Sequence, residues 1–175
     1  TPERGKAGLL TLTASKPLAA GTATLEIDFG QKFNTQAVGL YRMVKDGAAY
    51  TFTQFEAEEA RKAFPCFDEP AFKFPYQITL EVPAAHEGLS NTPLAKQEVR
   101  DGWKTLTFEK TPPMPSYLLA VATGPLEFTP VPGMKVPTRI VTVKGQSPLT
   151  GAAVQTTPPI LAALEAWFGS PYPYA

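Results

Sequence analysis

The stretch YTFTQFEAEEARKAFPCFDEP, residues 50–70, decides how the chain is expected to fold. Its first four residues are aromatic or β-branched, which is typical of a β-strand. Alternate side chains on a strand share a face, so we expect Gln54 and Glu56 to point to one side and Phe55 to the other. A short acidic, helix-like segment follows at 57–63, and a proline-bracketed aromatic turn comes after it. The stretch therefore predicts an amide and a carboxylate presented together, opposite an apolar anchor.

Short strands are predicted along most of the rest of the chain, because apolar and polar residues alternate between turn-forming residues. The pair Asp46-Gly47 tolerates the positive φ angles of a tight hairpin turn, and Asp101-Gly102 is expected to turn the chain into a later strand. The strand count indicates an all-β fold, an antiparallel β-sandwich or saddle-like domain. The strands are expected at 9–13, 22–29, 38–44, 49–53, 74–82, 88–91, 103–109, 117–123, 126–131 and 136–142.

The composition changes after Gly145, and a short C-terminal helical region is predicted in two pieces, at 151–156 and 159–168. The second piece has one apolar face at helical spacing, formed by Ile160, Leu161, Leu164, Trp167 and Phe168. The simpler interpretation packs this face into an ordinary core. If the helix instead begins a further domain, the face lacks its partner in this chain, and exposed apolar surface of that kind promotes association.

The composition excludes several classes of protein. The 175 residues carry 16 basic and 16 acidic side chains with no long basic cluster, so we expect no nucleic-acid partner. A hydrophobic content of 43% with 18% charged residues indicates a soluble globular domain, and no apolar run is long enough to span a membrane. A chain of this length buries roughly 70% of the surface of its unfolded form, which is enough for one core.

Histidine and cysteine are too few for the common metal and nucleophile sites. A two-histidine zinc site needs two histidines, and His86 is the only one in the sequence, so no zinc ligand set is expected in this chain. A cysteine nucleophile would need His86 beside Cys66, which follows Pro65 and is expected to behave as a small buried hydrophobe.

The remaining candidates for acid–base chemistry are the neighbouring carboxylates Asp68 and Glu69. Glycosidase carboxylates face each other across about 5–10 Å, whereas neighbours on an extended chain point apart. We expect Asp68 to form a turn by bonding its own backbone. Arg61 and Lys62 are expected to pair with Glu58, Asp68 or Glu69 and hold that turn. A small self-sufficient hydrolase that uses Asp68 and Glu69 is the less favoured alternative.

Two motifs in the opening stretch, TQFEA at 53–57 and ARKAFPCFDEP at 60–70, stand in an order found in a known family. They resemble the N-terminal domain of the zinc aminopeptidases of the aminopeptidase N family, which are gluzincin metallopeptidases. Further resemblances to the same family cover GLYR at 39–42, SYLLAVATGPLE at 116–127 and WFGSPYPY at 167–174.

The resemblance implies that a catalytic domain beyond this chain performs the chemistry. It implies a β-sandwich N-terminal domain at 1–145, incomplete at its start, and a helical linker at 146–175 that begins a truncated catalytic domain. That domain would supply the zinc of the parent enzyme, and this chain alone would have no metal, no catalytic residue and no activity. The implied partners are that catalytic domain, in the same polypeptide, and the N-terminus of a peptide substrate. The alternative is a stand-alone β-sandwich module that binds a peptide or another protein.

Gln54 and Glu56 are the substrate-binding residues that the resemblance implies. Glu56 would grip the substrate N-terminus together with a glutamate of the catalytic domain, and Gln54 would position the same end and line the first side-chain pocket. A free α-amino group has a pKa of about 7.7–8.0 and is mostly charged at neutral pH. A carboxylate in a poorly hydrated cleft binds such a cation through short, strong hydrogen bonds. Without the motif, both residues would be interpreted as a solvated polar face of a half-buried strand.

Overall fold

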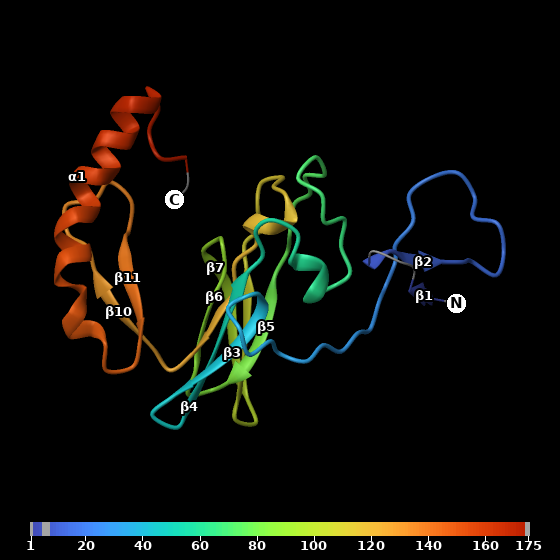
Figure 1. Cartoon of the computed structure of the whole chain (residues 1–175), viewed down its shortest axis with the longest axis horizontal. Helices are drawn as coiled ribbons and strands as arrows, with labels where there is room; N and C mark the ends of the chain where they lie inside the picture. The colour runs from blue at the N-terminus through green and yellow to red at the C-terminus, as the bar shows by residue number, and fades with distance from the viewer. Residues whose placement is uncertain (1, 5–7, 174–175) are drawn as a thin grey trace.

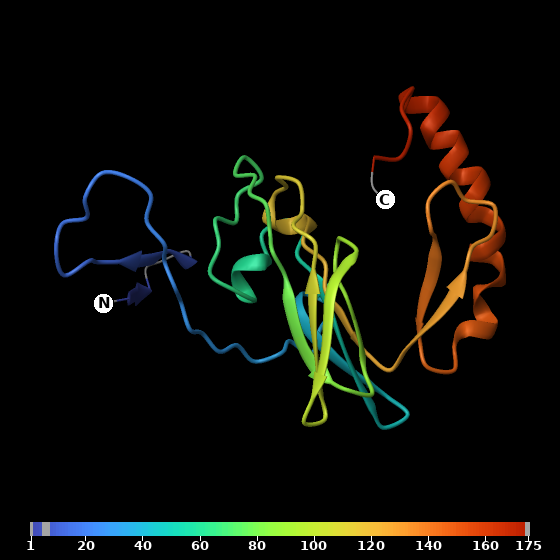
Figure 2. The same cartoon turned by 180° about the vertical axis from the view of Figure 1, so that it is seen from behind.

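The computed structural model of the chain describes residues 2–4 and 8–173. Its elements fall into separate groups along the longest axis, with two larger sheets at the centre (Figures 1 and 2). A small antiparallel pair lies at one end, formed by strands β1 (Pro2–Arg4) and β2 (Leu10–Leu12). The other end holds a second antiparallel pair and a helix, namely β10 (Leu126–Pro130), β11 (Arg139–Val143) and α1 (Gly151–Phe168).

The four-stranded central sheet is antiparallel and contains the hairpin predicted at Asp46-Gly47. Its strands, in spatial order, are β3 (Gly39–Lys45), β4 (Ala48–Gln54), β9 (Ala122–Gly124) and β6 (Glu87–Leu89). Asp46 and Gly47 have φ angles of 52° and 77°. Both angles lie in the left-handed region that a primed two-residue turn needs, so the predicted hairpin is confirmed.

The second central sheet has three antiparallel strands, in the order β5 (Thr79–Pro83), β8 (Trp103–Phe108) and β7 (Leu94–Arg100). The other Asp-Gly turn joins β7 to β8, with φ angles of 50° at Asp101 and 81° at Gly102. Strand β7 is absent from the predicted elements because all its residues are exposed and most are polar. A strand without a buried face leaves no alternating pattern in the sequence.

The two central sheets approach each other most closely where β6 meets β5 and β8. A Cβ atom placed on Gly88 would lie 2.6 Å from Leu106 Cδ1 and 3.2 Å from Leu80 Cδ1. Only glycine lets the backbone of β6 come this close. Val82, Leu106 and Phe108 form the buried core beside it. The antiparallel sheets, with α1 as the one α-helix in the part of the chain that the structure describes, confirm the predicted all-β class.

Some predicted strands differ from the structure. Residues 22–29 are exposed and form no strand, because no neighbouring strand in the described ranges pairs with their backbone. The strand predicted at 74–82 begins only at Thr79, where its pairing with β8 starts. The run at 117–123 begins with the 3-10 helix η3 (Ser116–Leu118), because a short apolar run suits a helical turn as well as a strand.

Helix α1 lies along β11 and follows the 3-10 helix η4 (Ser147–Thr150). The two helical pieces predicted from the sequence form one continuous helix, which passes through Pro158 and Pro159. Proline lacks a backbone N–H but fixes φ near its helical value, so the backbone can continue as a helix where neighbouring elements support it. No helix in residues 2–4 and 8–173 has the length and hydropathy that are needed to cross a membrane.

An apolar ridge on α1, formed by Ile160, Leu164, Trp167 and Phe168, is uncovered. No residue of α1 is buried, and the exposed fractions along the ridge are 56%, 47%, 85% and 72%. The interpretation of this helix as packed into an ordinary core is therefore wrong. The chain exposes 12571 Å² in total, compared with roughly 8,300 Å² for a compact protein of this mass. Much of its surface thus has the character of surface that a partner covers.

We expect the 175-residue chain to self-associate through the α1 ridge, because burying exposed apolar surface is favourable. Phe168→Glu should lower the average mass that light scattering measures at high protein concentration. Gln155→Glu adds the same charge to the same helix away from the ridge, and it should leave that mass unchanged. A monomeric mass for the unaltered chain at high concentration would contradict this expectation.

Candidate functional site

Gln54 and Glu56 lie where the chain leaves the four-stranded sheet at the end of β4. Gln54 is the last residue of β4 and pairs with Gly39 of β3. Glu56 lies in the turn that follows and is joined to Ala57 by a cis peptide bond. Both side chains are exposed, whereas Phe55 between them is 4% exposed. The strand was expected to continue through Glu56, but it ends at Gln54. Neither side chain has a hydrogen-bond or ion-pair partner among the residues that the structure describes.

Phe55 anchors this end of β4 in a hydrophobic cluster, here called the Phe55 cluster. The buried members of the cluster are Phe55, Ala60, Ala63 and Leu119. The rings of Phe55 and Phe64 meet edge to face with a centroid distance of 6.0 Å. Burial of a phenylalanine side chain contributes about 1.5–3 kcal/mol to stability. The polar pair is therefore carried on a backbone that a buried side chain holds in place.

Hydrogen bonds from a neighbouring segment hold the other edge of β4. The Val121 backbone N–H donates to Thr53 Oγ1 at 2.9 Å, and the Thr51 and Thr123 hydroxyl oxygens lie 2.6 Å apart. Strand β3 pairs with the opposite edge of β4 as far as Gln54. The backbone at Gln54 thus lies between two neighbouring segments, which gives the side chain a rigid base.

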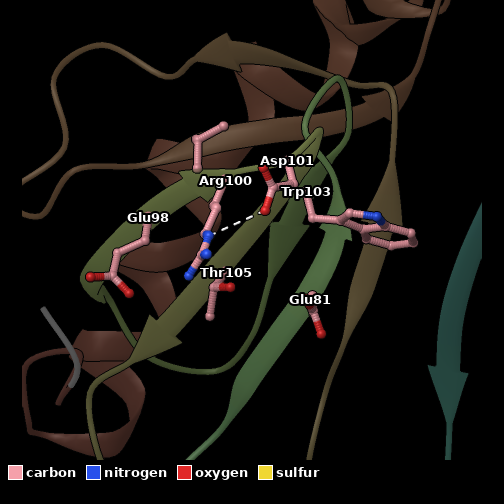
Figure 3. A pocket seen from close by; sticks show the side chains of 7 residues that line it. Glu81, Glu98, Arg100, Asp101, Trp103 and Thr105 are labelled. Carbon is pink, nitrogen blue, oxygen red and sulfur yellow. Dashed lines mark hydrogen bonds and ion pairs between the residues drawn. The ribbon is translucent and has the colours of Figure 1, made fainter.

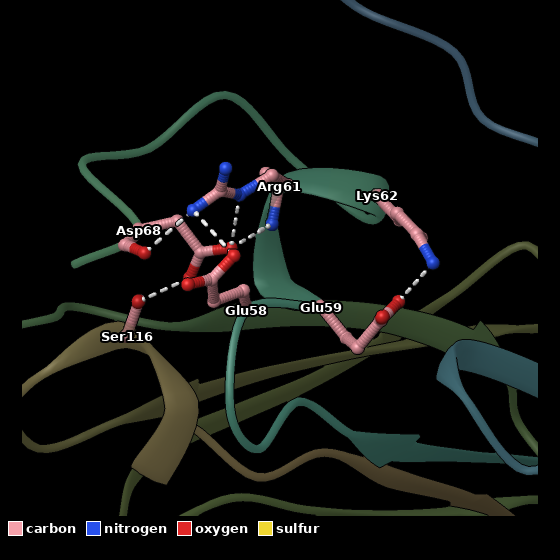
Figure 4. A network of polar contacts seen from close by, with 6 residues as sticks. All are labelled: Glu58, Glu59, Arg61, Lys62, Asp68 and Ser116. Carbon is pink, nitrogen blue, oxygen red and sulfur yellow. Dashed lines mark hydrogen bonds and ion pairs between the residues drawn. The ribbon is translucent and has the colours of Figure 1, made fainter. Parts of the chain in front are cut away.

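A buried carboxylate joins η3 to a second 3-10 helix, η2 (Ala60–Lys62), beside the site (Figure 4). The side chain of Asp68 is 2% exposed, and its Oδ2 accepts the backbone N–H of Arg61 at 3.0 Å and the Nε–H at 2.9 Å. A terminal nitrogen of Arg61 also donates to the Asp68 carbonyl at 2.8 Å. From η3, the Ser116 hydroxyl donates to Asp68 Oδ1 at 2.6 Å. We call Arg61, Asp68 and Ser116 the Asp68 network.

The Asp68 network keeps its carboxyl group ionised. Burial by itself raises the pKa of Asp68, but the hydrogen bonds from Ser116 and Arg61 outweigh it and bring that pKa below its ordinary value. The hydrogen bond to Asp68 raises the pKa of the Arg61 guanidinium. Both groups therefore carry their charges at neutral pH, and the pair is structural.

This geometry decides between the interpretations of Asp68 and Glu69. Both oxygens of Asp68 are occupied within the network, and Glu69 is exposed, so the two carboxylates do not face each other across a cleft. The predicted turn in which Asp68 bonds its own backbone is wrong, because Arg61 and Ser116 supply the donors. The predicted pairing of Arg61 with Glu58 and Asp68 is confirmed. Lys62 pairs instead with Glu59, which was not among its predicted partners.

The fold does not combine Cys66 with His86. Cys66 packs against the Phe55 cluster, and burial raises the pKa of its thiol to about 11, so the thiol is neutral at neutral pH. His86 lies in the turn before β6, where its backbone N–H donates to the Pro83 carbonyl at 2.8 Å. Within the described ranges, no three His, Cys, Asp or Glu side chains are grouped so that they could hold a metal ion. These residues therefore do not fit a zinc site.

A cavity of about 700 Å³ lies on the three-stranded sheet rather than at the end of β4 (Figure 3). It is lined by Glu81, Glu98, Val99, Arg100, Asp101, Trp103 and Thr105. Three of its charged groups are paired at the surface, Glu98 with Lys96 at 2.7 Å, and Arg100 with Asp101 at 3.2 Å. Exposed ion pairs of this kind are well hydrated and contribute little energy. The paired groups of this cavity are therefore solvated surface charges.

Comparison with known proteins gives one family and a set of related peptidases. The family model described as the peptidase M1 N-terminal domain matches residues 3–118, which include Gln54, Glu56 and the Asp68 network. Aminopeptidase M1-C of Oryza sativa subsp. japonica is 36% identical over 172 residues, 94% of this chain and 19% of that protein. Alanine/arginine aminopeptidase of Saccharomyces cerevisiae is 32% identical over 158 residues, 87% of this chain and 18% of that protein.

Glutamyl aminopeptidase of Rattus norvegicus is 39% identical over 129 residues, which are 69% of this chain and 14% of that protein. The chain thus spans about a fifth of the length of the curated relatives that it matches most fully. Helix α1 lies outside the matched family model, whereas most of it lies inside the alignment to the rice protein, because that alignment covers 94% of the chain.

The Asp68 network should make the stability of the chain sensitive to acid. Because folding lowers the pKa of Asp68, its ionised form stabilises the fold above the unfolded value of about 3.9. This contribution is lost as the pH falls through the lower pKa of the folded state. Asp68→Asn should reduce the free energy of unfolding at neutral pH by about 2–3 kcal/mol, measured by urea denaturation. It should also flatten the loss of stability in acid.

Glu69→Gln is the matched control, because it removes the same charge from the neighbouring exposed residue. It should change the free energy of unfolding by less than about 0.5 kcal/mol. Equal losses of stability in the two variants would show that burial and hydrogen bonding of Asp68 are not the cause.

Proposed function

The chain belongs to the peptidase M1 N-terminal domain family, and from this we propose that it is the substrate-orienting domain of a zinc-dependent aminopeptidase. Such an enzyme removes residues from the N-terminus of peptides. The observation that carries the proposal is the position of Glu56. It is an exposed carboxylate without a partner in the described part of the chain, it follows a strand anchored by the Phe55 cluster, and it lies within the matched residues 3–118.

Glu56 is proposed to bind the α-ammonium group of the substrate. A free α-amino group has a pKa of about 7.7–8.0, so most of it is protonated at neutral pH. A carboxylate that accepts hydrogen bonds from this cation forms short, charge-assisted contacts. An internal peptide bond offers no cation, so the enclosed carboxylate would stay unpaired and the substrate would be rejected. The carboxylate thereby selects chain ends over chain interiors.

Gln54 is proposed to position the same end of the substrate and to line the pocket for its first side chain. Its exposed side chain lies two residues before Glu56, at the end of the anchored strand. A primary amide both donates and accepts hydrogen bonds, so it suits the mixed polar groups of a peptide backbone.

The metal chemistry belongs, in this proposal, to a catalytic domain of the same polypeptide. Two observations support this assignment: the described residues form no zinc site, and the relatives are about five times as long as the chain. Residues 1–145 then form the β-rich N-terminal domain, and residues 146–175 lead into the catalytic domain, with the α1 ridge packed against it. Without that domain, the chain is expected to have no peptidase activity.

Strand pairing bears on where the proposed boundary between the two domains lies. Among the described strands, β10 and β11 pair only with each other, and α1 packs along β11. This pairing associates residues 126–143 with the helix rather than with the central sheets.

A stand-alone module that binds a peptide or another protein is the second candidate. It is favoured by a cluster of partly exposed aromatic rings, Phe67, Phe72 and Phe74, whose centroids lie 5.5–6.3 Å apart. The encoded sequence after residue 175 separates the candidates. A His-Glu-x-x-His motif there establishes the peptidase, and a stop codon favours the module.

In the full polypeptide, Glu56→Ala should reduce kcat/KM for an aminoacyl substrate. The reduction should correspond to a loss of about 2–5 kcal/mol in transition-state stabilisation. The reason is that the substrate cation loses its partner in a site that the catalytic domain is proposed to close over Glu56. The rate is measured on a substrate with a free α-amino group, and Gln54→Ala should cause a smaller loss.

Glu69→Ala is the control for this experiment, because it removes another exposed carboxylate from the same stretch of chain. It should leave kcat/KM within about twofold of the unaltered enzyme. An unchanged rate in Glu56→Ala would remove Glu56 from the substrate site.

A further inference from the structure

The side chain of Glu56 is exposed, but the backbone that carries it is held on both sides. On the N-terminal side, Gln54 pairs with Gly39 of β3, and Thr53 accepts a hydrogen bond from Val121. A carboxylate that binds a cation gains from such restraint, because less conformational entropy is lost when the ligand binds. The restraint on the C-terminal side therefore bears on substrate binding as well.

On the C-terminal side, the chain is tied down within five residues of Glu56. The Glu59 N–H donates to the Phe55 carbonyl at 2.9 Å, which closes the turn containing Glu56. Arg61 then makes three hydrogen bonds to Asp68, one from its backbone and two from its guanidinium group (Figure 4). Two of these reach the buried carboxylate, so the position of η2 depends on that charge.

Ser116 links Asp68 to the segment that also contacts β4, so contacts join the chain on both sides of Glu56. It donates to the second oxygen of Asp68 and opens η3, after which the chain runs through Leu119 of the Phe55 cluster to Val121. The Val121 backbone N–H donates to Thr53 on β4. The loop that carries Glu56 is therefore tied at both ends to one segment, residues 116–121.

We propose that Asp68 is a positioning residue for Glu56, acting through Arg61 on one side and Ser116 on the other. The inference rests on the proposed function, in which Glu56 binds the substrate ammonium group. The Asp68 side chain is 2% exposed and cannot itself touch substrate. Removing its charge weakens the bond to the Arg61 backbone and allows η2 to shift relative to residues 116–121. Hydrogen bonds to the ammonium group weaken steeply with misalignment, so a small shift of Glu56 reduces binding.

The ion pair between Glu59 and Lys62 provides an internal control. It lies in the same stretch, but it joins residues three apart in the sequence and ties no distant segments together. The Lys62 side chain is 56% exposed, so Lys62→Met removes a charge without opening the core. This variant should leave the substrate kinetics unchanged.

The test is a double-mutant cycle in the full polypeptide, with a substrate that carries a free α-amino group. It is run at a temperature at which circular dichroism shows every variant to be folded. Asp68→Asn should lower kcat/KM by about tenfold or more, mainly through a higher KM, because binding of the ammonium group is weakened throughout the reaction. In the Glu56→Ala background, the same change should cost less than about twofold, because no carboxylate is left to position.

Each outcome of the cycle separates this inference from the proposed function. Equal effects of Asp68→Asn with and without Glu56 would overturn the positioning role and leave the substrate role of Glu56 standing. A kinetic loss in Lys62→Met as large as that in Asp68→Asn would also overturn it. An unchanged rate in Glu56→Ala would overturn the proposed function, and the positioning role with it.

Milder variants keep the inference testable if Asp68→Asn does not fold. Ser116→Ala removes one hydrogen bond from the carboxylate and should give a loss of about threefold that again disappears without Glu56. Both Arg61→Lys and Arg61→Ala keep the backbone N–H, but only Arg61→Lys retains the positive charge, so it should keep more activity. Equal losses in the two Arg61 variants, or a Ser116→Ala effect independent of Glu56, would contradict the inference.

Discussion

A carboxylate that is almost sealed from water has to be paired, because an uncompensated buried charge costs several kcal/mol. Asp68 meets this constraint by accepting hydrogen bonds from Arg61 in η2 and from Ser116 in η3. The two donors lie on segments that are far apart in the sequence, so satisfying one charge brings both segments to the end of β4. The Phe55 cluster fills the space between them. The arrangement leaves the Glu56 carboxylate exposed on a restrained turn, without a partner among the residues that the structure describes.

The rest of the chain contrasts with this well-packed end. The α1 ridge and the rings of Phe67, Phe72 and Phe74 remain exposed to solvent, and the total accessible area far exceeds that of a compact protein. Large exposed apolar surface of this kind usually marks a site where another domain or protein binds. In the proposed enzyme the catalytic domain covers this surface and brings the metal to the substrate end that Gln54 and Glu56 hold. The N-terminal domain then contributes orientation, and the chemistry takes place on its partner.

Local rules in the sequence predicted the features that depend on neighbours along the chain. The Asp46-Gly47 turn follows from backbone preferences, and the structure has it. The burial of Phe55 beside exposed Gln54 fits the alternation expected at the end of a strand. Features that depend on distant contacts were missed. Ser116 lies 48 residues from Asp68, so no local pattern reveals that it supplies the donor. Strand β7 was missed because its exposed, mostly polar residues leave no alternating pattern. The strand predicted at 22–29 is absent because no strand in the described ranges pairs with it. The roles proposed for Gln54 and Glu56 came from a family resemblance, because exposed polar residues at the end of a strand are by themselves common.

The most direct test of the account is a crystal structure of the full polypeptide with a bound peptide analogue that has a free N-terminus. The account predicts a Glu56 carboxylate oxygen within about 2.7–3.2 Å of the ligand α-nitrogen, with Gln54 beside the first residue. A ligand whose α-nitrogen is held entirely by other groups, with Glu56 directed into solvent, would contradict it.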